Sequence, residues 1–78
     1  MSHENITMPA AVRQELDLLL AAIKRATTTD EAERAGIRAD GFILGVERLR
    51  ALQPLSIEAL YLVVEQAVEL RAGEISAT

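Results

Sequence analysis

The sequence has no cysteine and no tryptophan, and its aromatic side chains are limited to Phe42 and Tyr61. Without cysteine there is no disulfide framework, no thiolate nucleophile and no cysteine-based metal site. The single histidine, His3, stands at the start of the chain, so no Ser/His/Asp or Cys/His constellation can be assembled. We therefore expect a non-enzymatic protein with no cofactor and no metal.

Basic residues are also few. Eight lysines and arginines stand against 12 acidic residues, which gives a net charge of −4. Affinity for nucleic acid comes mainly from clustered Lys and Arg, so we do not expect a nucleic-acid partner. The longest apolar run, residues 18–23, is far below the ~18 residues that a membrane span needs, and the start lacks a signal-peptide pattern. These absences predict a cytoplasmic protein with no membrane contact.

Half of the 78 residues are apolar, and alanine (13) and leucine (11) dominate them. Both are strong helix formers, and β-branched residues are too few and too scattered for a sheet. The sequence predicts one all-α domain over residues 7–73, with a disordered N-terminus at 1–6 and a frayed C-terminus at 74–78. A domain this small buries only about 60% of its unfolded surface, so its stability alone is marginal.

Three helices are predicted from the helical spacing of the apolar residues, over residues 10–26, 29–52 and 57–72. Both connections are short, so neighbouring helices should run antiparallel. At ~1.5 Å per residue, the second helix would be about 35 Å long and its neighbours about 25 Å. The expected fold is a three-helix, up-down-up arrangement with a long central helix, which forms a helical-bundle dimer.

The helix ends are predicted from capping residues. Thr28 and Glu31 fit a capping box at the start of the second helix. Pro54 ends that helix, because proline removes a hydrogen bond and clashes with the preceding turn. Ser56 is expected to cap the third helix, and Gly73 to end it in the left-handed conformation.

The predicted core combines one face of each helix. In the second helix, Phe42, Val46 and Leu49 continue the 3-4 spacing of a packed seam. The expected core residues are Val12, Leu16, Leu19, Ile23, Phe42, Val46, Leu49, Ile57, Leu60, Val64 and Val68.

Three glycines lower the helix propensity of the second helix. Gly36, Gly41 and Gly45 each cost about 1 kcal/mol relative to alanine inside a helix. Asp40 followed by Gly41 is also a turn signal, so a competing interpretation breaks the helix there. We prefer a continuous helix, because the apolar spacing passes through residues 39–42 without a slip.

A second apolar face is predicted on the outer side of the same helix. Ile37 and Leu44 lie seven residues apart, opposite the inner seam, and Gly41 and Gly45 form a smooth notch beside them. A helix that is apolar on two sides is usually sandwiched between partners, although single exposed apolar residues are also common. We predict a protein interface at Ile37, Gly41, Leu44, Gly45 and Leu62, used for homodimerisation or for a separate protein target.

The third helix carries an acidic stripe of Glu58, Glu65 and Glu69, with Leu62 among them. One interpretation is a solvated helix face. The other is a surface that binds arginine or mimics DNA.

A DNA-binding helix-turn-helix is the alternative architecture for the second and third helices, which residues 53–56 join. The recognition helix would begin at residues 57–62, where no Arg, Lys, Asn or Gln is available to contact a base edge. A DNA-associated transcriptional regulator, or an antitoxin-like protein, is therefore the alternative function.

The stretch from Glu31 to Phe42, followed by Gly45 and Leu49, resembles small uncharacterised helical proteins of bacteriophage and prophage regions. The shared wording, A-E-R-A…R-A-D-G-F…G, covers about a quarter of the chain. The resemblance implies a bacterial or phage origin and a role in modulating a host protein by direct binding. The expected function is a non-enzymatic helical interaction module.

Overall fold

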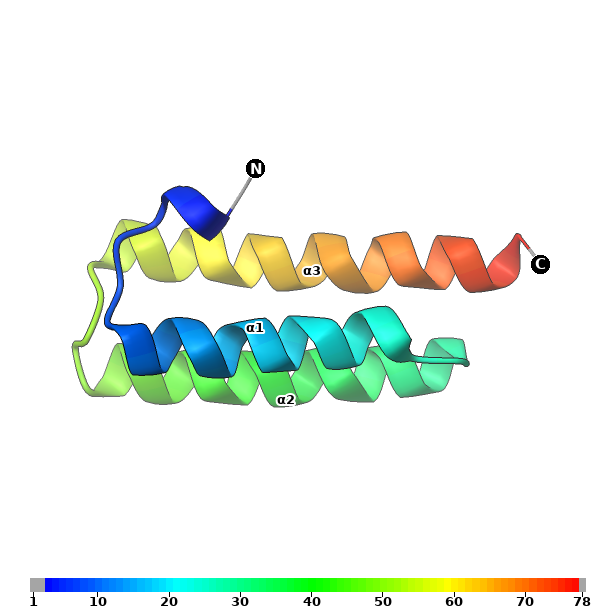
Figure 1. Cartoon of the computed structure of the whole chain (residues 1–78), viewed down its shortest axis with the longest axis horizontal. Coiled ribbons are helices and arrows are strands. Elements are labelled where there is room, and N and C mark those ends of the chain that lie inside the picture. The colour runs from blue at the N-terminus through cyan, green and yellow to red at the C-terminus, as the bar shows by residue number, and fades with distance from the viewer. Residues whose placement is uncertain (1–2, 78) are drawn as a thin grey trace.

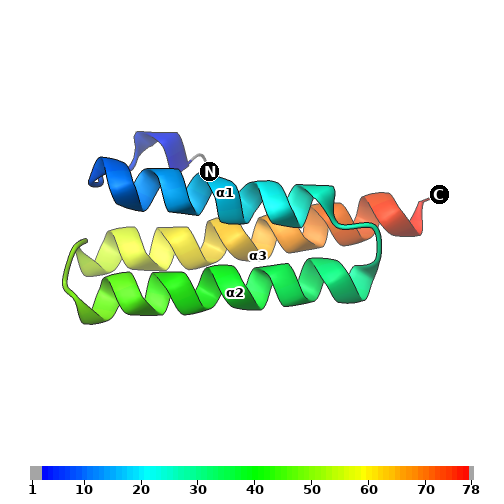
Figure 2. The same ribbon diagram turned by 60° about the horizontal axis from the view of Figure 1, so that its bottom comes forward.

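A computed structural model describes residues 3–77, which contain three α-helices, one short 3-10 helix and no strand. The elements are η1 (His3–Asn5), α1 (Ala10–Arg25), α2 (Thr29–Arg48) and α3 (Pro54–Ser76). The prediction of an all-helical fold with three main helices is confirmed. Figure 1 shows that α1 and α3 run in one direction and α2 in the other, and Figure 2 shows the two connections at opposite ends. None of the described helices combines the length and apolarity needed to cross a membrane.

The longest helix is α3, not the central one. It has 23 residues, against 20 in α2 and 16 in α1. The prediction of a long central helix is therefore wrong, and it is α3 whose C-terminal end extends beyond its neighbours (Figure 1). Pro54 begins α3 instead of preceding it, because proline fits the first helical position, where its missing N–H is not needed.

Both predicted ends of α3 differ from the structure. Its N-cap is Gln53, so Ser56 lies inside the first turn. Gly73 also lies inside the helix without a positive φ, so it does not end it. The helix continues to Ser76, through most of the tail that was expected to be frayed, and Thr78 lies outside the described residues.

The α1–α2 connection follows the predicted cap. Thr28 Oγ1 accepts a hydrogen bond from the Glu31 backbone N–H at 3.0 Å. The Glu31 carboxylate turns back to Thr27, whose hydroxyl donates to it at 3.0 Å, so the box closes one residue earlier than expected. Arg71 Nε donates to the carbonyl oxygen of buried Ala26 at 2.8 Å, which ties α3 to this connection.

Helix α2 ends at Arg48, four residues before the predicted end. Arg50 has a φ of 54°, in the left-handed region. The Arg50 N–H donates to the Glu47 carbonyl at 3.0 Å, and the Ala51 N–H to the Val46 carbonyl at 3.2 Å. These two bonds form a Schellman motif, which satisfies carbonyls of the last turn.

The core lies between the inner faces of the three helices. Helix α2 is continuous through Asp40 and Gly41, as preferred, but its buried residue at the next turn is Ile43, while Phe42 is half-buried. Leu49 is 82% exposed, so its assignment to the core is wrong. The predicted seam kept a strict seven-residue repeat, whereas a straight helix of 3.6 residues per turn drifts away from it. The central buried cluster is Leu16, Ile23, Ala35, Ala39, Ile43, Val46, Ile57, Leu60 and Val64.

The N-terminal segment packs on the bundle. Where the sequence predicts disorder over residues 1–6, His3–Asn5 form η1 and contact α3. His3 Nε2 lies 3.0 Å from Asp17 Oδ1, and Ile6 packs against the core cluster. Residues 1 and 2 lie outside the described range.

Candidate protein-binding site

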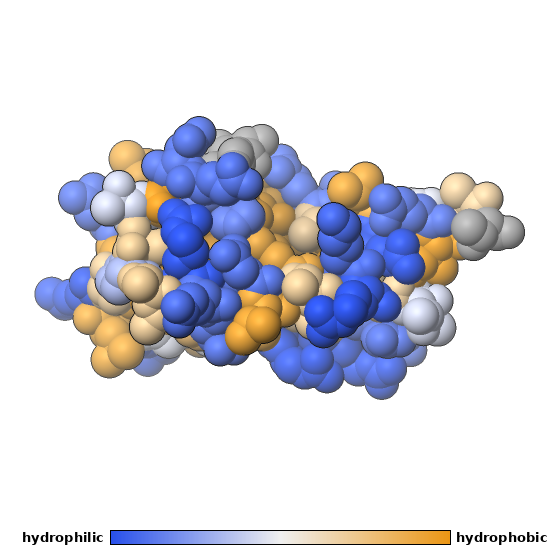
Figure 3. Space-filling view, in the orientation of Figure 1, coloured by the Kyte–Doolittle hydropathy of each residue, from blue (hydrophilic) through white to orange (hydrophobic). Residues whose placement is uncertain are grey.

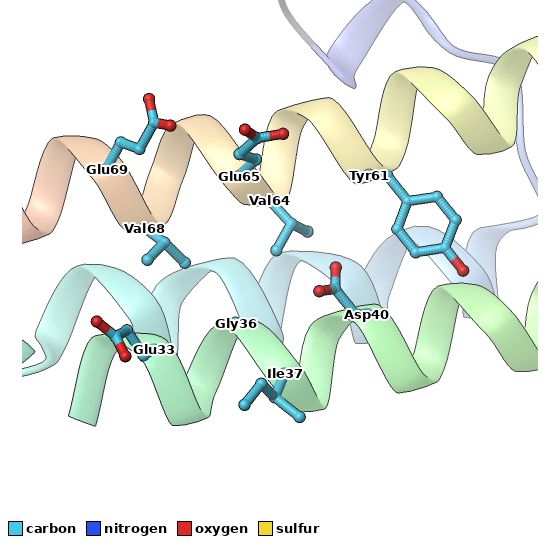
Figure 4. A pocket seen from close by; sticks show the side chains of 9 residues that line it. All are labelled: Glu33, Gly36, Ile37, Asp40, Tyr61, Val64, Glu65, Val68 and Glu69. Atoms are coloured by element: carbon cyan, nitrogen blue, oxygen red, sulfur yellow. The ribbon is translucent and has the colours of Figure 1, made fainter. Parts of the chain in front are cut away.

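A groove of about 470 Å³ runs between α2 and α3 (Figure 4). Val64 and Val68 point from α3 toward α2 and form its floor with Gly36. Tyr61 and Ile37 also line it. The groove therefore offers an apolar floor that runs along two packed helices.

Gly36 explains why the floor is closed. A Cβ at this position would lie 2.6 Å from Cγ2 of Val68, which is closer than real contacts allow. The missing side chain lets α3 approach α2, so Val68 fills the space above the glycine. Gly41 and Gly45 have a different role, because a Cβ at either position would meet nothing within 4 Å.

Four carboxylates surround this floor. Glu33 and Asp40 come from α2, and Glu65 and Glu69 from α3. Among the described residues that line the groove there is no lysine or arginine. Burial raises the pKa of Asp40, and the nearby Glu65 carboxylate raises it further. The negative charges of the two helices therefore repel one another across the groove.

Nearby carboxylates also affect Tyr61, which lines the same groove. The pKa of Tyr61 is raised first by desolvation and then by the carboxylates of Glu47 and Asp40. Glu47 follows Asp40 by seven residues on α2, as Asp40 follows Glu33. Glu58 precedes Glu65 by seven residues on α3, so both helices continue an acidic row along one side.

The predicted interface residues lie at the surface but do not all meet in the groove. Ile37 is 69% exposed and lies at the groove, while Leu44 is 43% exposed one heptad further along α2. Gly41 and Gly45 are exposed near Leu44, and none of these three lines the groove. Leu62 on α3 is 40% exposed and does not line it either.

The groove itself was missed by sequence reasoning. The acidic residues Glu33, Asp40 and Glu47 of α2 repeat every seven residues. That repeat matches the acidic stripe of α3, and antiparallel packing brings the two rows together. The matching seven-residue repeats of acidic residues on α2 and α3 are the sequence signal that indicates the groove.

A second hollow lies between α1 and α3, and Figure 3 shows apolar side chains there among hydrophilic ones. Leu20, Val63 and Leu70 contribute its apolar surface. Lys24 and Glu74 are both among its lining residues, so it carries charges of both signs. Arg71 also lines it, so two cations stand against one carboxylate.

No group of three or more His, Asp or Glu side chains within residues 3–77 is placed to hold a metal ion. The groove contains carboxylates and one phenol but no paired nucleophile and base. No protein-family model, no curated protein and no solved structure matches the chain. The geometry of the groove and of the α2 surface therefore carries the functional argument.

Proposed function

We propose that this chain is a non-enzymatic interaction module that binds a protein through the outer side of α2. The observation that carries the proposal is the exposure of Ile37 (69%) and Leu44 (43%) on a helix whose opposite face is already buried in the core. Burying an exposed aliphatic side chain contributes about 1.5–3 kcal/mol. The α2 stripe, defined here as Ile37, Gly41 and Leu44, would therefore gain free energy when a partner covers it.

The partner under this proposal is a second copy of the chain or a different protein. The phage-type resemblance of residues 31–42 favours a modulator of a bacterial host protein. A cytoplasmic location, which fits the cysteine-free composition, remains part of the proposal. DNA binding gains no support from the α2–α3 groove, because the carboxylates that line it repel phosphates.

The proposal is tested with a stripe variant, Ile37→Glu with Leu44→Glu. Its matched control is Leu18→Glu with Leu55→Glu, which places the same charges on leucines that are 64% and 78% exposed outside α2. Size-exclusion chromatography with light scattering measures self-association over a concentration series. Affinity capture from bacterial extract then measures other partners, and circular dichroism checks that helicity is retained.

The expected result is that the wild type and the control variant self-associate or retain a partner, and that the stripe variant does neither. If the wild type is a monomer and the stripe variant retains the same proteins as the wild type, the proposed interface is wrong.

A further inference from the structure

The α2–α3 groove has the shape of a binding groove for another helix. Its floor of Gly36, Val64 and Val68 runs along two antiparallel helices that pack against each other more extensively than any other pair. A three-helix bundle accepts a fourth helix in such a groove, where apolar side chains at helical spacing meet the floor. Ile37 continues the apolar surface onto the α2 stripe.

The negative charge of the groove favours a positively charged partner over a neutral or negatively charged one. Its four lining carboxylates form no ion pair with another residue of the described chain. Successive carboxylates of the α2 row, Glu33, Asp40 and Glu47, are about 10.5 Å apart along the helix. A bound helix with Lys or Arg at every seventh position on its flanks would pair with such a row. It would also remove the repulsion between Asp40 and Glu65.

A second copy of the chain fits this groove poorly. With its own groove turned toward this one, it would bring acidic rows against the same carboxylates, and like charges across an interface cost several kcal/mol. Nucleic acid is repelled for the same reason. An apolar helix without charge would fill the floor but leave the carboxylates partly desolvated and unpaired, which costs free energy.

We propose that the groove between α2 and α3 binds a basic amphipathic helix of another protein, with its apolar side on the accessible surface of Ile37, Tyr61 and Val68 and its cations beside the two acidic rows. This inference rests on the proposed function, because it names the chemistry of the partner that the module binds. The α2 stripe and the groove are then neighbouring parts of one binding face.

The probe is a displayed library of amphipathic helices about three heptads long. Its seam positions are fixed as apolar, and its flanking positions vary among Lys, Arg, Gln and Glu. Tyrosine and tryptophan are left out of the library, so that Tyr61, the single tyrosine of a chain without tryptophan, reports binding by its fluorescence. Enriched peptides are then synthesised and titrated by calorimetry.

The groove variant is Asp40→Asn with Glu65→Gln. Its matched control is Glu15→Gln with Asp30→Asn, which removes two exposed carboxylates outside the groove and changes the net charge of −4 by the same amount. If general attraction to an acidic protein were the cause, the two variants would lose affinity equally. If the groove is the site, only the groove variant loses it.

We expect Lys and Arg to be enriched at the flanking positions and Tyr61 fluorescence to change on binding. Affinity should fall about tenfold in the groove variant and stay within about twofold in the control variant. Equal affinities in the two variants, enrichment without charge preference, or an unchanged Tyr61 signal would each overturn the inference. The two proposals fail separately: equal affinities of the groove and control variants overturn this inference, whereas a stripe variant that associates like the wild type overturns the proposed function.

Discussion

Gly36 of α2 lies so close to Val68 of α3 that an added Cβ would be 2.6 Å from the Val68 Cγ2 atom. Alanine at position 36 would gain at most about 1 kcal/mol from helix propensity. Overpacking typically costs about 1–3 kcal/mol, and the β-branched Val68 side chain has little rotamer freedom to move aside. We expect Gly36→Ala to lower the free energy of unfolding by up to about 2 kcal/mol, measured by urea denaturation.

A second substitution tests the cause of that loss. Val68→Ala removes the clashing methyl group, so Gly36→Ala should cost less in the Val68→Ala background than in the wild type. An equal cost in both backgrounds, or a gain from Gly36→Ala alone, would show that this contact does not set the helix spacing.

For Gly41 and Gly45, we expect substitution by alanine to raise the free energy of unfolding. Neither has an atom within 4 Å of the position that a Cβ would take, and both lie inside α2. Gly41→Ala and Gly45→Ala should each stabilise the monomer by up to about 1 kcal/mol, through helix propensity and a less flexible unfolded chain. Thermal denaturation by circular dichroism should show a Tm higher by about 4–8 °C per kcal/mol.

The same two variants separate stability from binding. If Gly41 allows a partner to approach the α2 stripe, Gly41→Ala should weaken association although it raises Tm. A Tm at or below that of the wild type for both variants would contradict the open positions seen in the structure.

Arg50 lies just after the end of α2, where the sequence has no glycine to indicate a helix end. It adopts a φ of 54°, where a non-glycine residue costs roughly 1–2 kcal/mol. Arg50→Gly should therefore stabilise the chain by about 1 kcal/mol, measured by urea denaturation. Arg48→Gly, two residues earlier at the last residue of α2, should destabilise the chain by up to about 1 kcal/mol. If both variants lost stability alike, position 50 would not be left-handed.

The sequence predicted most of the local structure and less of the packing. The Thr28 cap and the continuity of α2 through Gly41 depend on neighbouring residues, and both are confirmed. The end of α2 was missed because the left-handed residue is Arg50 instead of a glycine. The burial of Ile43 was missed because it depends on the rotation of α2 against both neighbours.

In the candidate site, too, the local features were predicted and the packing between helices was not. The outward position of Ile37 and Leu44 follows from helical spacing alone, and the structure places both at the surface. The groove requires Asp40 of one helix to face Glu65 of another, which no local pattern specifies. The sequence contains only the seven-residue repeat of acidic residues on each helix, and not the way in which the two helices pack.

The Asp40–Glu65 pair predicts a pH dependence of stability. Burial and the Glu65 charge raise the Asp40 pKa in the folded state above its ordinary value, so the folded carboxyl holds its proton more tightly than the unfolded one. Ionised Asp40 therefore lowers stability at neutral pH. This cost is relieved as the pH falls through the raised pKa toward the ordinary aspartate range.

Asp40→Asn removes that charge permanently, so it should raise Tm at pH 7, and its advantage over the wild type should shrink toward about pH 4. For an exposed like-charge pair we expect a gain of at most about 0.5 kcal/mol, which corresponds to at most roughly 2–4 °C. Glu65→Gln should give a similar gain at pH 7. Because either substitution alone abolishes the repulsion, the double variant should gain less than the sum of the two single variants. Strict additivity, or an advantage of Asp40→Asn that grows on acidification, would show that the two carboxylates do not interact across the groove.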